Sequence, residues 1–145
     1  MARVGMWLVI VGLWRMAYGR WQEMAFRFEG LDVFQLAVDY AMLVYRVTKD
    51  FPRDEVFGMT ANLRRAATSI AHNIAEGSGR GTDRDFAHFV DVAMGSLFET
   101  VASFIVAERL SYVGPEQMEE IRTNAATLRR KLNSFKKALA TSHKQ

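Results

Sequence analysis

FPRDEVFGMTANLRRAATSIAHNIAEGSGR, residues 51–80, is the stretch that decides the fold. Pro52 fixes its own φ angle and disfavours helix at Phe51, so a preceding helix is expected to end near residue 50. Asp54 and Glu55 then fit the first turn of a new helix, where the helix dipole favours negative charge. The sequence therefore predicts a helix boundary at this proline.

Apolar residues recur after the proline at alternating spacings of three and four, which is typical of one face of a helix. They are Val56, Met59, Leu63, Ala66 and Ile70. Gly77 and Gly79 are candidates for the C-cap, because glycine adopts a left-handed conformation without steric cost. We therefore predict a helix over about residues 54–76, closed by a glycine turn.

An ordered motif runs through this stretch and beyond it. Its residues are Phe51-Pro52, Glu55, Phe57-Gly58, Arg64-Arg65-Ala66-Ala67, Ser69-Ile70, Asn73-Ile74-Ala75-Glu76-Gly77 and Arg80, followed by Phe86, Phe89, Ala93, Gly95-Ser96-Leu97 and Glu99. This string resembles the four-helix-bundle proteins encoded in 23S rRNA intervening sequences, to which the accessory variability determinant proteins of diversity-generating retroelements are related. The resemblance extends over about residues 27–115. It departs from the family pattern at Ala71, where proline is usual, and at His72, where a small residue is usual.

The resemblance implies a four-helix protomer, a homopentameric ring and a basic surface that meets nucleic acid or a nucleic-acid enzyme. It marks Pro52, Asn73, Glu76 and Gly77 as structural motif residues. For Asn73 and Glu76 we expect hydrogen bonds to the adjoining turn, to Arg80 or to a neighbouring helix, rather than a ligand role, because buried polar groups are normally satisfied.

The length and composition favour one all-α domain. A chain of 145 residues buries enough surface to fold without cross-links. It contains no cysteine, so disulfides and thiolate chemistry are excluded, which fits a reducing cytoplasm. Only two prolines interrupt a sequence rich in good helix formers.

Residues 1–23 differ in pattern from the rest of the chain. The apolar run of residues 6–14 is too short to span a bilayer, which needs about 20 residues. Our preferred interpretation is an N-terminal extension outside the fold, with a bundle domain over residues 24–145. A partner- or membrane-contacting arm and a signal peptide remain open as alternatives.

Helix one is predicted over about residues 31–49 and is apolar on two sides. One stripe is Leu31, Phe34, Val38, Ala41 and Tyr45, and the second is Val33, Ala37, Tyr40, Val44 and Val47. Two interpretations fit: a central helix of a bundle, or a second stripe that forms a subunit interface. We lean to the interface because of the resemblance.

Helix three is predicted over about residues 83–111, with Thr82 or Asp83 as its N-cap. Its core stripe is Phe86, Val90, Ala93, Leu97, Phe104 and Ala107, and further apolar residues on both flanks widen the arc. So wide an apolar arc exceeds what a helix of a monomer needs, which indicates an oligomer.

Gly114-Pro115 breaks the chain before helix four, predicted over about residues 116–141. Its apolar seam is Met118, Ile121, Ala125, Leu128, Leu132, Phe135 and Leu139, and its other faces are polar and basic. Four helices with short connections predict an up-down antiparallel four-helix bundle.

The sequence shows no constellation for catalysis or for a cofactor. Gly77-Ser78-Gly79 follows a helix rather than a strand, so it is not a phosphate-cradling loop. No GxSxG elbow is present, and the Asp85–His88 pair is one approximate element where a di-iron bundle needs two. We therefore expect no enzyme activity, no metal site and no cofactor.

Nine basic residues are the candidates for binding nucleic acid or a partner. Arg and Lys bind phosphate backbones by charge and by forked hydrogen bonds, and the competing interpretation is a solvated face or intersubunit ion pairs. The residues are Arg64, Arg65, Arg80 and Arg84, expected around the end of helix two and the following turn or one helical stripe from it, and Arg129, Arg130, Lys131, Lys136 and Lys137 on helix four.

Two functions follow as hypotheses. The first is a homo-oligomeric bundle that binds structured RNA or DNA. The second is a protein-interaction scaffold that docks a nucleic-acid enzyme such as a reverse transcriptase. No small-molecule substrate and no membrane partner are expected in either.

Overall fold

The computed structural model describes residues 26–142. Four long helices make up this part of the chain: α2 (Asp32–Thr48), α3 (Met59–Ser78), α4 (Asp83–Arg109) and α5 (Pro115–Thr141). Two short 3-10 helices, η1 (Arg27–Gly30) and η2 (Arg53–Glu55), precede α2 and α3. The described residues contain no strand, so the predicted all-α class is confirmed. The predicted extension over residues 1–23 lies outside the described residues.

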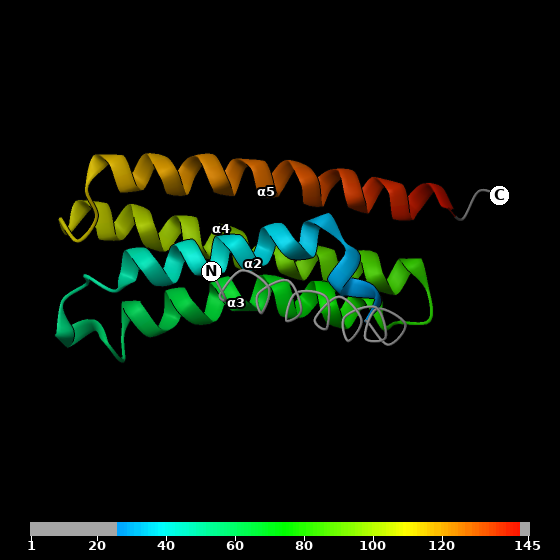
Figure 1. Ribbon diagram of the computed structural model, residues 1–145, viewed down its shortest axis with the longest axis horizontal. Coiled ribbons are helices and arrows are strands. Elements are labelled where there is room, and N and C mark those ends of the chain that lie inside the picture. Colours follow the sequence, from blue (N-terminus) through cyan, green and yellow to red (C-terminus); the bar gives the residue numbers. More distant parts are fainter. Residues whose placement is uncertain (1–25, 143–145) are drawn as a thin grey trace, which may run out of the picture.

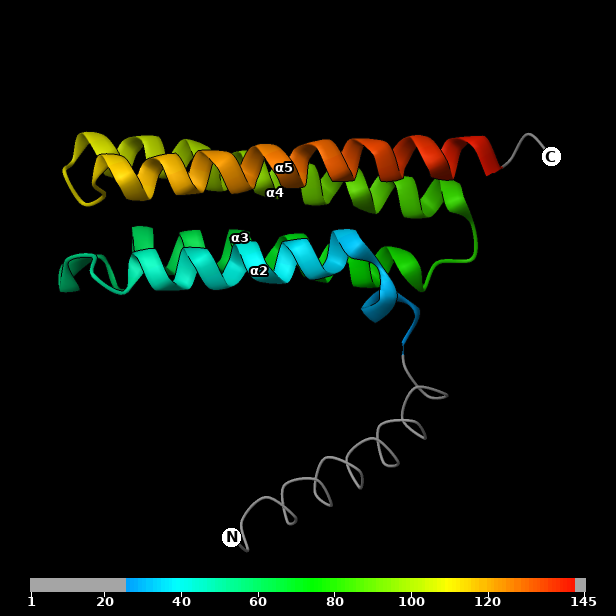
Figure 2. The ribbon, with the colours of Figure 1, turned by 45° about the horizontal axis from the view of Figure 1, so that its top comes forward.

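The helices lie side by side along a common axis (Figure 1). α3 packs against both α2 and α4, and α5 packs against both α4 and α2. The turned view shows α2 and α3 as one layer and α4 and α5 as a second (Figure 2). The core lies between these layers.

The apolar stripe predicted for helix three and the seam predicted for helix four both face this core. On α4, Phe86, Val90, Ala93, Leu97, Phe104 and Ala107 are all buried. On α5 the whole seam is buried except Phe135, which is half-buried against the ring of Phe86. Thr82 is the N-cap of α4, since its hydroxyl accepts the N–H of Asp85 at 3.1 Å.

The lean toward a subunit interface on helix one was wrong. The second stripe of α2, from Val33 to Val47, is buried inside the protomer. The first stripe is the more exposed of the two, and Tyr45 on it is open to solvent. Burying the β-branched and aromatic stripe against α3 and α5 fills the core, and this leaves the other stripe at its edge.

Helix α3 begins five residues later than the predicted residue 54. Residues 53–55 form η2, and the Glu55 carboxylate folds forward so that Oε2 accepts the N–H of Met59 at 2.9 Å. The acidic side chain therefore stabilises the N-terminus of the helix from outside it, as a capping group does. Val56 and Phe57 then lie in the turn before the helix, and Phe57 is 96% exposed.

Of the two predicted C-cap candidates, Gly79 is the C-cap of α3, but the predicted left-handed conformation was wrong, since the φ angle of Gly79 is −89°. Gly77 lies inside α3, and no glycine among the described residues has a positive φ angle. A Cβ atom built on Gly77 would lie 2.4 Å from Cδ2 of Phe86. Glycine is required at this position because the first turn of α4 packs directly on the α3 backbone.

Candidate nucleic-acid interface

The nine basic candidates do not form one surface. Arg64 and Arg65 lie in the first half of α3, whereas Arg80 lies in the turn after it. Ser78, the last residue of α3, comes 14 residues after Arg64, which is about 21 Å along the helix. Arg80 and Arg84 therefore lie at the helix end, whereas Arg64 and Arg65 lie further back along the helix, where the prediction also allowed them.

Arg64 is held by the helix beside it. Its Nε donates to Oγ1 of Thr48 at 3.0 Å, and its guanidinium carbon lies 4.6 Å from the centre of the Tyr45 ring. A cation placed over an aromatic face at this distance is attracted by the ring quadrupole. The side chain therefore links α3 to α2, and it is only half-buried. Its neighbour Arg65 is exposed and donates to Oδ1 of Asn62 at 3.0 Å.

Arg80 is engaged with two neighbours at the α3–α4 turn. It pairs with Glu76 at 2.5 Å, and its guanidinium carbon lies 4.5 Å from the centre of the Phe89 ring. The predicted Glu76–Arg80 pair is thus present. Arg84, in the first turn of α4, is exposed.

The expectation for Asn73 was wrong, because this residue bonds within its own helix and not to the turn, to Arg80 or to a neighbouring helix. Its Nδ2 donates to the carbonyl of Ser69 at 2.8 Å and to the Ser69 hydroxyl at 3.0 Å. The Ser69 hydroxyl in turn lies 3.0 Å from the Ser96 hydroxyl on α4. Asn73 therefore orients a polar contact between α3 and α4. Pro52, with φ of −53°, separates α2 from η2 as predicted.

The C-terminal half of α5 carries the densest positive charge. Arg129, Arg130, Lys131 and Lys137 are exposed, and none of them is in a salt bridge with the described residues. Lys136 is the exception, because its ammonium group lies 2.6 Å from Oδ1 of Asp91 on α4. The acidic residues of α5, Glu116, Glu119 and Glu120, lie in its first two turns. The negative side chains are therefore at the positive end of the helix dipole and the basic side chains are toward its negative end, which is the favourable arrangement.

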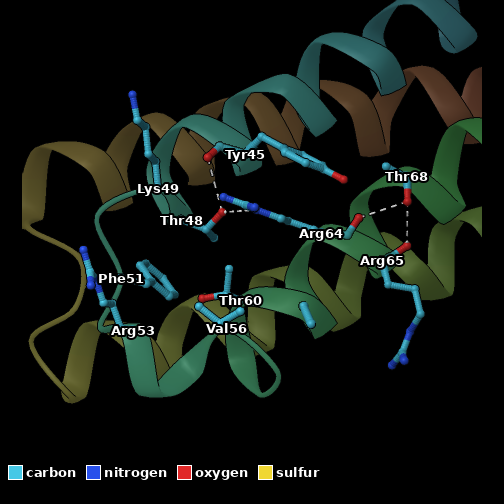
Figure 3. Close-up of a pocket in the computed structure, with 11 residues that line it drawn as sticks. Tyr45, Thr48, Lys49, Phe51, Arg53, Val56, Thr60, Arg64, Arg65 and Thr68 are labelled. Carbon is cyan, nitrogen blue, oxygen red and sulfur yellow. Dashed lines mark hydrogen bonds between the residues drawn. The ribbon is translucent and has the colours of Figure 1, made fainter.

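A cavity that the sequence did not reveal opens between α2, η2 and α3 (Figure 3). It has a volume of about 570 Å³. Four cationic residues line it: Lys49, Arg53, Arg64 and Arg65. Of these, Lys49 and Arg53 were missed, because they lie in the α2–α3 connection and meet the arginines of α3 only in the fold. The other lining residues are Tyr45, Thr48, Phe51, Val56, Thr60, Ala61 and Thr68.

The described histidines and carboxylates do not form a metal-binding cluster. Among residues 26–142, no group of three or more His, Asp or Glu side chains is placed to hold a metal ion. His88 of the Asp85–His88 pair lies beside Phe89 at 5.9 Å between ring centres. Burial raises the pKa of Tyr40 to about 12. Burial, followed by the charge of Glu55, raises the pKa of Tyr112.

Comparison with known proteins identifies the family. Residues 29–134 match the model of the 23S rRNA-intervening sequence proteins. The chain belongs to this family. The predicted resemblance is therefore confirmed, and the family's function is unknown.

A solved structure supports the fold. The chain is similar to the crystal structure of a protein of unknown function from the S23 ribosomal protein family of Bacteroides thetaiotaomicron, with a TM-score of 0.64 and 24% sequence identity. The match covers 72% of this chain and 98% of that one. At this identity the likeness shows the fold alone. The comparison with curated proteins gives no match.

Proposed function

We propose that this family member is a non-enzymatic, homo-oligomeric helical bundle that binds structured RNA or DNA through basic surfaces. The observation that carries the proposal is the exposed half of α5 from Arg129 to Lys137. Four of its five basic side chains have no carboxylate partner among the described residues. Cations without a protein partner are available to neutralise phosphates. The name of the family, which refers to 23S rRNA intervening sequences, supports RNA as the partner.

The mechanism is backbone electrostatics. Each phosphate that a Lys or Arg neutralises releases condensed counterions, so the logarithm of the affinity falls linearly with the logarithm of the salt concentration. No aromatic residue lies between the cations of residues 129–131, so base stacking does not contribute there. Such contacts position a duplex or a folded RNA without reading its sequence.

The proposal includes an up-down antiparallel arrangement and a ring of copies, five by the family resemblance. Consecutive helices pack against each other and are joined by short connections, which supports antiparallel neighbours. Apolar side chains left exposed on α4 support self-association, since soluble monomers rarely present large apolar patches. They are Val92, Phe98 and Val106, together with Leu110 at the C-cap of α4.

The test is RNA binding in a salt series with charge-matched variants. Arg129→Gln/Arg130→Gln/Lys131→Gln removes three cations from α5. Arg27→Gln/Arg46→Gln/Arg109→Gln removes three exposed cations elsewhere, so both variants lower the formal net charge from +3 to 0. We expect the α5 variant to bind a structured RNA at least tenfold more weakly and with a salt slope lower by about 2, and the control to keep most of the affinity. Equal weakening in both variants, or no binding by the wild type at low salt, would contradict the proposal.

The alternative function is a scaffold that docks a nucleic-acid-processing protein such as a reverse transcriptase. The nearly complete exposure of Phe57, at the end of the bundle, favours it, because aromatic residues are enriched where proteins meet. Treatment of a purified complex with nuclease separates the two functions, because a protein partner stays bound and a nucleic acid is lost.

Localisation in the cytoplasm belongs to the proposal as well. Within residues 26–142, α4 alone is long and apolar enough in composition to cross a membrane. One such helix is weak grounds for a membrane protein, since a core helix of a soluble bundle passes the same test. The buried stripe of α4 packs against α3 and α5, which supports the soluble bundle.

A further inference from the structure

We propose that the cavity between α2, η2 and α3 binds the phosphate group of a phosphorylated ligand. The cavity and the basic half of α5 share no residue, so this inference goes beyond the nucleic-acid surface and stands without it. Four observations carry it: the charge of the lining, an unpartnered buried hydroxyl, the position of the Arg64 fork, and the N-terminus of α3.

The lining is cationic and unneutralised. Lys49, Arg53, Arg64 and Arg65 line the cavity, and no acidic residue is among its described lining residues. Glu55, which is close in sequence, is turned to other partners: Oε2 accepts the N–H of Met59 and Oε1 accepts the hydroxyl of Tyr112 at 3.3 Å. The charge that remains attracts an anion, and arginine forks match the geometry of phosphate oxygens.

Thr60 shows that a polar partner is missing. Its residue is 7% exposed, it lines the cavity, and its hydroxyl has no hydrogen-bond partner. Thr48, on the opposite side, differs, because its hydroxyl donates to the carbonyl of Val44 and accepts from Nε of Arg64. An unsatisfied buried hydroxyl costs about 1–3 kcal/mol. The Thr60 oxygen is closed to solvent in this structure, so a rotation about χ1 would bring it to an oxygen acceptor in the cavity and remove that cost.

Arg64 is pre-oriented to supply the main contact. Its side chain extends across the cavity between Tyr45 and Thr48 (Figure 3). Only Nε is used in a hydrogen bond to the described residues, so the two Nη groups remain for a ligand. In Figure 3 the ends of Lys49 and Arg65 turn away from the cavity. We therefore assign a direct contact to Arg64, a second one to Thr60 after that rotation, and longer-range attraction to the other cations.

The N-terminus of α3 adds to the same field. The N–H groups of Thr60 and Ala61, the second and third residues of the helix, have no hydrogen-bond acceptor among the described residues. Both residues line the cavity. Free N–H groups and the positive end of the dipole favour an anion at such a position.

The size of the cavity limits the ligand class. A volume of about 570 Å³ exceeds what a phosphate ion fills, and it falls in the range of small-molecule sites. The remaining volume fits the nucleoside part of a mononucleotide or of the terminal nucleotide of a nucleic acid. The two sources share the phosphate chemistry, and the experiment separates them.

The test measures binding to the full chain by titration calorimetry with inorganic phosphate, with a nucleoside monophosphate and with the matching nucleoside. We expect phosphate and the monophosphate to bind and the nucleoside not to bind. Arg64→Gln should weaken binding at least tenfold and Thr60→Val about threefold to tenfold, because charged hydrogen bonds contribute more than neutral ones. Arg122→Gln, which removes an exposed cation that pairs with Glu108, should change binding less than twofold.

Thr60→Val keeps the proposal testable if Arg64→Gln fails to fold. Valine matches threonine in shape and removes the unsatisfied hydroxyl, so the ligand-free variant should melt at or above the temperature of the wild type. Phosphate should raise the melting temperature of the wild type and raise that of Thr60→Val less. The proposal would be overturned if phosphate stabilised both chains equally. It would also be overturned if the wild type bound neither phosphate nor nucleotide at about 10 mM, a concentration at which even a weak specific site is occupied.

Two RNAs of one sequence, with a 5′-phosphate and with a 5′-hydroxyl, identify the source. A preference for the 5′-phosphate that Arg64→Gln abolishes supports the cavity as a site for a nucleic-acid end. Monophosphate binding without that preference supports a free phosphate ester. The α5 variant Arg129→Gln/Arg130→Gln/Lys131→Gln should leave phosphate binding unchanged in either case. Loss of RNA binding by α5 can therefore be distinguished from loss of phosphate binding in the cavity.

Discussion

The hydroxyl of Tyr40 on α2 lies 2.8 Å from the hydroxyl of Thr100 on α4, and both residues are buried in the centre of the bundle. The Thr100 hydroxyl donates its one hydrogen to the carbonyl of Leu97 at 2.7 Å. Tyr40 is therefore the donor to Thr100. This polar contact joins two helices that belong to different layers, and it fixes how the layers meet.

The buried phenol predicts loss of stability at alkaline pH. Burial raises the pKa of Tyr40 from 10.0 to about 12. Between pH 10 and 12 the unfolded chain loses a proton that the folded chain retains, so the free energy of unfolding falls by about 2–3 kcal/mol as the pH rises through this range. Below pH 10 the contribution is fully present. Tyr40→Phe removes the titrating group, so its stability should fall less steeply above pH 10.

The measurement is denaturant unfolding at pH 8, 10 and 11 for both chains, because the other titrating groups are common to them. Thr100 keeps its bond to Leu97 in the variant, so no buried hydroxyl is orphaned. Parallel stability curves for the wild type and Tyr40→Phe would show that this phenol is not held neutral by burial.

Gly77→Ala should destabilise the fold by about 1–3 kcal/mol through overpacking. An added Cβ would lie 2.4 Å from Cδ2 of Phe86 and 2.9 Å from Cβ of Phe89, and the Phe86 ring is itself held against Phe135. Gly95→Ala is the matched control, since nothing lies within 4 Å of a Cβ at that exposed position of α4. It should stabilise the helix by up to about 1 kcal/mol. Thermal unfolding of the two variants should therefore shift in opposite directions.

Glu55 is predicted to affect both a helix terminus and a tyrosine. Glu55→Ala removes the acceptor of the Met59 N–H and should cost about 0.5–2 kcal/mol, as loss of a capping group does. Glu55→Gln removes the charge and should lower the pKa of Tyr112 toward its ordinary value, because that charge helps to raise it. Ultraviolet titration of the tyrosines checks the second effect. Tyr112→Phe identifies the tyrosine responsible and leaves the Met59 contact intact.

The sequence predicted the fold where periodicity decides it. The stripe from Phe86 to Ala107 and the seam from Met118 to Leu139 each contact one core, so their spacing alone shows which face is buried. The start of α3 was misplaced because Val56 continues the apolar period without being part of the helix. The helix begins at Met59 instead, where the Glu55 carboxylate accepts the backbone N–H, and the spacing of apolar residues does not predict such a contact.

The site was less predictable because it depends on tertiary contacts. The sequence motif identified Arg64 and Arg65 as candidates. Lys49 and Arg53 line the same cavity only once the α2–α3 connection is folded, so the sequence did not identify them. Thr60 carried no signal at all in the sequence, since an unsatisfied hydroxyl is recognised only by its burial. Conversely, the charges of Arg129 to Lys137 were visible in the sequence because they follow one another along a single helix.

The exposed flank of α4 predicts where copies of the chain meet. Val92, Val106 and Leu110 share this flank, because 14 residues make about four helical turns and the next four make one more. Val106 and Leu110 are 49% and 50% exposed.

Val106→Lys/Leu110→Lys should lower the mass measured by sedimentation toward that of one chain, with helical circular dichroism unchanged, since surface substitutions alter stability little. Thr123→Lys/Asn133→Lys places the same number of charges on exposed positions of α5 instead and should leave the mass unchanged. A wild-type chain that sediments as a monomer would remove the ring from the proposal, and a double variant that stays assembled would place the interface on another face.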